Sequence, residues 1–109
     1  IGKAQWLLGS LLKIKPVLEI SDGHVEGIAK ARSHVKALDK IRIITESLGD
    51  IEEMSVVYNT TSEEAKSLGQ NTSHLIPGKN TFYTTFGPVI GTYSGPGAIG
   101  IVSLLKKTS

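Results

Sequence analysis

Cysteine is absent from the 109-residue chain, which excludes a disulfide framework and a zinc site built on thiolates. Long apolar runs are also absent, because no stretch approaches the roughly 20 residues that a transmembrane helix needs. Neither basic nor acidic residues are in large excess, since 12 basic and 10 acidic residues leave a net charge of +2. This balance gives no reason to expect nucleic acid or an anionic membrane surface as a partner.

The remaining composition is that of an ordinary globular domain. Hydrophobic residues make up 39% and charged residues 20%, which favours a packed core over disorder or a coiled coil. A length of 109 residues suits one core, so we predict a single domain over residues 1–109. The chain begins with Ile1 and has no signal-peptide layout, and we expect it to be a piece of a longer protein.

The first third of the sequence predicts a helix followed by a β-hairpin. Apolar residues dominate residues 3–12, and Pro16 ends this helix because the residue before a proline prefers extended geometry. A short strand follows over residues 17–20. The Asp22-Gly23 pair is the strongest short-range signal of a tight hairpin turn, and it predicts a second strand over residues 24–31.

The middle of the sequence predicts a capped amphipathic helix and a strand. Ser33 is a good N-cap for a helix from His34 to Leu48, whose apolar residues recur at helical spacing. Gly49 is expected to end this helix. Residues 54–58 predict a strand that is buried on at least one face.

The last half predicts smaller elements that alternate with turns. Thr61 and Glu64 form a capping box, which places a short helix after them. In chain order the expected elements are this helix to Leu68, a turn-rich stretch over 69–79, a strand over 80–90, a glycine-rich loop over 91–97 and a strand over 98–105, paired like a hairpin with the strand before it. The order predicts an α/β (α+β) fold, with one mixed, mostly antiparallel sheet of five or six strands and two or three helices mainly on one face.

The residue types that carry catalysis are present but are not grouped. His24, His34 and His74 show no metal-ligand spacing. The pairs Glu52-Glu53 and Glu63-Glu64 fit loop ends and a helix's first turn better than an acid–base site. No nucleophile motif occurs. The sequence therefore predicts a binding protein rather than an enzyme, with no metal and no cofactor.

A glycine-rich loop is the first candidate binding feature. Glycines at 91, 95 and 97 with Pro96 allow a sharp turn and close approach of a ligand to the backbone. Exposed N–H groups and nearby hydroxyls suit a carboxylate or phosphate. The candidate residues of this loop are Thr92, Tyr93, Ser94, Gly95 and Gly97. Composition alone favours the alternative, a structural turn between two strands.

Arg32 is the second candidate. It follows an apolar strand and precedes a helix, where a guanidinium can reach an anion. The alternative is an ordinary surface cation at a strand end, and the residues alone favour that interpretation.

Three segments in order resemble the DegV family. Residues 1–18 with Asp22-Gly23 resemble the entry to the family's second domain, and residues 31–38 resemble its arginine-bearing helix start. The run Pro88-Val-Ile-Gly-Thr-Tyr-Ser-Gly-Pro-Gly-Ala-Ile-Gly100 resembles its most recognisable C-terminal stretch. The family's histidine before the Gly-Pro-Gly run is replaced here by Tyr93, which can donate a hydrogen bond but cannot become cationic near neutral pH.

The resemblance implies the C-terminal domain of a bacterial, cytoplasmic, two-domain protein that binds one long-chain fatty acid. Its implied partners are the N-terminal domain, which is missing from this chain, and a fatty-acid kinase that phosphorylates the acyl carboxylate. Arg32 and the loop residues would then bind the carboxylate, or Arg32 would dock the kinase. The alternative hypothesis is an interaction or regulatory domain without a small-molecule site of its own.

Overall fold

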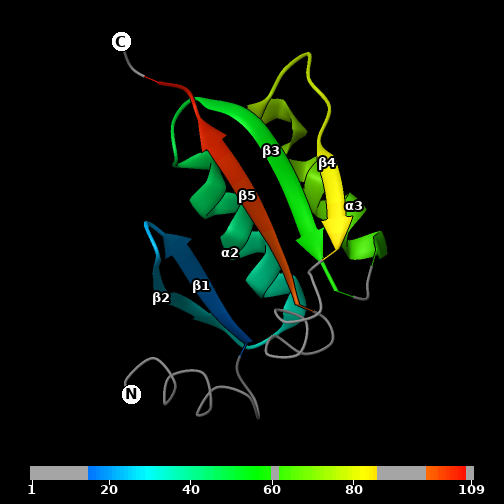
Figure 1. The fold of residues 1–109 in the computed structure, drawn as a ribbon. Coiled ribbons are helices and arrows are strands. Elements are labelled where there is room, and N and C mark those ends of the chain that lie inside the picture. Colours follow the sequence, from blue (N-terminus) through cyan, green and yellow to red (C-terminus); the bar gives the residue numbers. More distant parts are fainter. Residues whose placement is uncertain (1–14, 60–61, 86–97, 108–109) are drawn as a thin grey trace. The chain divides into compact units, whose positions relative to one another are not determined.

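The computed structural model describes residues 15–59, 62–85 and 98–107 (Figure 1). Its elements are β1 (Lys15–Ser21), β2 (His24–Ala31), α2 (His34–Glu46), β3 (Ile51–Tyr58), α3 (Ser62–Thr72), the 3₁₀ helix η1 (Ser73–Leu75), β4 (Phe82–Thr85) and β5 (Ile99–Leu105). The predicted mixed α/β class is confirmed. Contacts divide the chain into two compact units, residues 1–41 and 42–109, with the boundary inside α2. The helix predicted over residues 3–12 lies outside the described residues.

The first unit contains the predicted hairpin of β1 and β2. Asp22 and Gly23 both have positive φ, 51° and 78°, as a type I′ turn requires. This turn matches the twist of the flanking strands and pairs Ser21 with His24. An irregularity next to Val17 leaves Ile28 as the extra residue of a bulge in β2. The hairpin therefore turns at the Asp22-Gly23 pair, as the sequence predicts.

Helix α2 begins at the predicted cap. The Lys36 backbone N–H donates to the Ser33 hydroxyl oxygen at 3.2 Å, which satisfies one of the unpaired donors of the first turn. The helix ends at Glu46 and not at Leu48, because the Leu48 N–H bonds to the carbonyl three residues earlier and tightens the last turn. Gly49 follows with a φ of 96°, the left-handed geometry that ends helices.

The second unit contains a three-stranded sheet in the order β4-β3-β5 (Figure 1). Strand β3 pairs parallel with β4 and antiparallel with β5. The prediction that the last two strands pair with each other is therefore wrong. Helix α3 connects β3 to β4 as a crossover, which makes them parallel neighbours, and β5 takes the other edge of β3. The described strands thus form sheets of two and three strands, where the sequence predicted one sheet.

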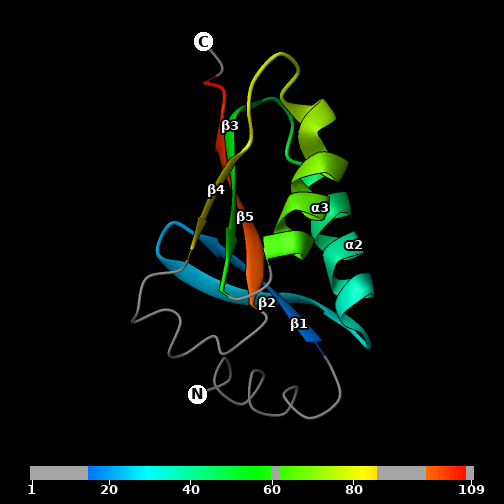
Figure 2. The same ribbon diagram turned by 90° about the vertical axis from the view of Figure 1, so that its right-hand side faces the viewer.

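A bulge extends β3 and completes the core of the second unit. Pairing with β5 shifts between Ile51 and Glu53, so that Ile51 joins Met54 on the same face. Strand β3 therefore starts three residues before the predicted Met54. Ile51, Met54 and Ile76 form a cluster of buried side chains, with Leu75 packed against it. Figure 2 shows α3 on one side of this sheet.

Helix α3 runs past the glycine at which the sequence predicted its end. It continues from Leu68 to Thr72, whose buried hydroxyl donates to the Leu68 carbonyl at 2.8 Å. This position of the helix requires glycine, because a Cβ here would collide with the phenol group of Tyr83 on β4. The glycine therefore allows strand and helix to approach closely, and it is not a helix terminator.

Candidate functional site

Arg32 lies between β2 and α2, in the first unit. Ala31 before it is buried, and Ser33 after it is the N-cap of α2. The Arg32 side chain is exposed, and no hydrogen bond or ion pair joins it to another residue in the described part of the chain. A cation next to the positive end of a helix forms an electrostatic environment that attracts anions.

Other basic residues add to the positive charge around Arg32. Lys30 on β2 and Lys36 in the first turn of α2 are both exposed. No acidic residue occurs in the sequence between Glu26 and Asp39. The start of α2 therefore has a local excess of positive charge, although the net charge of the whole chain is only +2.

The other predicted site residues lie outside the described residues. They are Thr92, Tyr93, Ser94, Gly95 and Gly97. Strands β4 and β5, which precede and follow these residues in the sequence, are described. Both pair with the last residue of β3. Thr85 at the end of β4 and Ile99 at the start of β5 each pair with Tyr58. The end of β4 and the start of β5 therefore lie on either side of the carboxyl end of β3.

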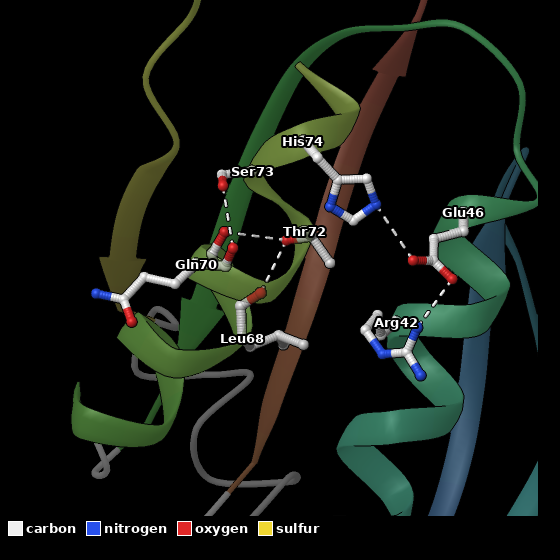
Figure 3. Close-up of polar contacts among 8 residues, drawn as sticks. Arg42, Glu46, Leu68, Gln70, Thr72, Ser73 and His74 are labelled. Atoms are coloured by element: carbon white, nitrogen blue, oxygen red, sulfur yellow. Dashed lines mark hydrogen bonds and ion pairs between the residues drawn. The ribbon is translucent and has the colours of Figure 1, made fainter. Parts of the chain in front are cut away.

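A second group of ionisable side chains joins α2 to η1 (Figure 3). Glu46 accepts from the Arg42 guanidinium at 3.0 Å, and its other oxygen lies 3.3 Å from Nε2 of His74. Arg42 and Glu46 are about one-third exposed and His74 is more than half exposed. Pairs this exposed contribute at most about 1 kcal/mol each, so we interpret the group as a surface tether of the second unit.

The remaining candidates for chemistry are dispersed. Glu63 and Glu64 lie in the first turn of α3, as predicted, where negative charge is favourable. The described residues contain no group of three side chains suited to hold a metal ion. Among them, no helix is both long and apolar enough to cross a membrane.

Strands β4 and β5 carry exposed apolar side chains that the sequence pattern does not reveal. Phe82 and Val102 are each 60% exposed, and Leu104 is 54% exposed. In β5, apolar residues occupy both alternating sets of positions. Its sequence therefore does not show which face of the strand is covered.

Comparison with known proteins identifies relatives over almost the whole chain. Residues 1–106 match the family described as an uncharacterised protein of the DegV family. A DegV domain-containing protein of Listeria innocua is 34% identical over 109 residues, which cover 97% of this chain and 38% of that protein.

Solved structures give the same relationship. A fatty acid binding DegV family protein from Streptococcus agalactiae has a TM-score of 0.78 and 27% identity, over 96% of this chain and 38% of that one. DegV from Bacillus subtilis, a fatty acid binding protein, has a TM-score of 0.73 and 32% identity over the same shares. The chain spans less than two-fifths of the length of these relatives. With the family match over residues 1–106, the chain belongs to the DegV family.

Proposed function

We propose that this chain supplies one part of a fatty-acid-binding site, and that the N-terminal domain of the full-length protein supplies the rest. The observation that carries the proposal is the likeness to two solved DegV proteins that are named for fatty acid binding. Their sequences are 27% and 32% identical to this chain over 96% of its length. The chain covers 38% of each, and we propose that the rest of the polypeptide completes the site.

A fatty acid requires two different environments. Its hydrocarbon tail needs a long apolar slot, and its carboxylate needs a cation or several hydrogen-bond donors where it leaves water. Positive charge at the start of α2 provides the first kind of carboxylate partner, through Arg32. Donors of the second kind come from the loop residues Thr92, Tyr93, Ser94, Gly95 and Gly97, whose backbone and hydroxyl groups suit an anion.

The site presents the carboxylate and does not transform it. The chain holds the carboxylate at the mouth of the slot, where a separate fatty-acid kinase that uses ATP phosphorylates it. The described residues contain no group of three side chains suited to hold a metal ion, and phosphoryl transfer is the task of the separate kinase. The site of action is the bacterial cytoplasm, which supplies ATP to the kinase.

A comparison of two lipids tests the proposal. Delipidated full-length protein is titrated calorimetrically with oleic acid and with oleyl alcohol, which has the same tail without a charge. The acid should bind at least about tenfold more tightly, because hydrogen bonds to a charged group contribute about 1.5–3 kcal/mol. Equal affinities would exclude a carboxylate site. Binding of neither lipid would favour an interaction domain without its own ligand.

A further inference from the structure

The β4-β3-β5 sheet has one largely apolar face that no described element of the second unit covers. Residues paired directly across neighbouring strands point to the same face. Ser55 at the centre of β3 pairs with Phe82 on β4 and with Val102 on β5. The next rows add Val57 with Thr84 and Gly100, and Glu53 with Leu104. We call these eight residues the open face.

Burial distinguishes the open face from the opposite one. Met54 and Val56, at the alternate positions of β3, are 1% and 0% exposed. On the open face, Phe82 and Val102 are 60% exposed and Leu104 is 54% exposed. When one face of a sheet is solvated, its outward residues are normally polar, but here three large apolar side chains lie on the two edge strands, β4 and β5, and Glu53 is the one charged member.

We infer that the open face is the docking surface for the part of the full-length polypeptide that this chain lacks. The chain accounts for 38% of the length of its relatives, so most of the polypeptide remains to cover a surface of this kind. The rows of Ser55 and Val57 contain no charged residue, so a permanent interface over them would desolvate no charge. The inference deepens the proposed function, which requires a second domain, and names where that domain docks.

Physical arguments favour this occupant over two others. A single acyl chain lying on a flat sheet face would leave most of its own surface in water, whereas lipid sites enclose most of their ligand. A second copy of the protein must find the face by diffusion. A domain in the same polypeptide has a much higher effective concentration, on the order of millimolar for short linkers.

Carbene footprinting of the full-length protein tests the inference. The protein is labelled with a photoactivated diazirine in delipidated and oleate-loaded monomeric form, and each residue's labelling is compared with that in denatured protein. Phe82, Val102 and Leu104 should be labelled at least about tenfold less than in the denatured protein in both forms, as buried Met54 should be. Labelling near the level expected of half-exposed side chains would overturn the inference.

Other protection patterns also decide the question. Protection only after oleate loading would assign the face to the acyl chain, and protection only in a dimer would assign it to a second copy. Either result contradicts docking of the missing domain. Bound fatty acid is measured in the same samples. A protected face without bound lipid contradicts the proposed function alone, and an exposed face with bound lipid contradicts this inference alone.

A pair of charge substitutions provides a second measurement in the full-length protein. Val102→Glu places a carboxylate in the proposed interface, and should lower the melting temperature by about 5 °C or more. Val35→Glu is the matched control on α2, where Val35 is 75% exposed, and should change it by less than about 2 °C. Equal small shifts would contradict burial of the open face.

Discussion

Replacing Met54 by alanine should lower the free energy of unfolding of the 109-residue chain by about 2–5 kcal/mol. Met54 is 1% exposed and lies between Ile51 and Ile76 in the core of the second unit. The substitution removes buried apolar atoms and leaves a cavity that the surrounding strand and helix can fill only in part. Chemical denaturation followed by circular dichroism measures the change.

Leu104→Ala is the matched control for this substitution. It also removes three heavy atoms from the same sheet, but from the open face, where Leu104 is 54% exposed. The expected loss in this chain is about 1 kcal/mol or less, because less apolar area returns to water. Equal losses for Met54→Ala and Leu104→Ala would contradict the assignment of covered and open faces.

Replacing Arg32 by alanine should weaken binding of oleic acid to the full-length protein by about 10- to 100-fold. The guanidinium of Arg32 is exposed at the start of α2, where neighbouring residues in the sequence are also basic. A hydrogen bond to a charged group contributes about 1.5–3 kcal/mol. Oleyl alcohol should lose little affinity because it has no charge to pair. Titration calorimetry of both lipids measures the difference.

Lys36→Ala controls for the loss of a nearby positive charge. Lys36 is an exposed cation in the first turn of α2, and its removal should change the affinity for oleic acid by less than about threefold. Unchanged affinity in the Arg32→Ala variant would contradict a role for Arg32 in carboxylate binding. If phosphorylation of the bound fatty acid by the proposed kinase then fell, the result would favour a contact between Arg32 and that kinase.

The elements that the sequence predicted well depend on local chemistry. The hairpin turn requires positive φ at two successive residues, and Asp22-Gly23 satisfies this requirement within the turn itself. The start of α2 depends on one hydrogen bond to Ser33, three residues from its donor. Such signals are complete within a few residues, so neighbouring sequence is enough to identify them.

The predictions that failed depend on contacts between distant parts of the chain. Gly69 is typical of a helix end, but its role depends on Tyr83, which lies on strand β4. The partners of β4 and β5 depend on the crossover through α3, and strand periodicity does not encode that choice. The covered face of β5 could not be predicted either, because apolar residues occupy both of its faces.

The candidate site shows the same division. Arg32 could be chosen from its place between a strand and a helix, and the structure puts it there, exposed and next to the cap of α2. Its relation to residues 92–97 remains a prediction, because those residues lie outside the described part of the chain. Their importance rests on the glycines and hydroxyls of the sequence and on family resemblance.

Native mass spectrometry of the full-length protein, purified without added lipid, tests whether the protein binds a fatty acid. We expect a polypeptide carrying one fatty acid, which organic extraction releases and identifies. A mass equal to that of the polypeptide alone, with no uptake of added oleic acid, would contradict fatty-acid binding and favour an interaction domain.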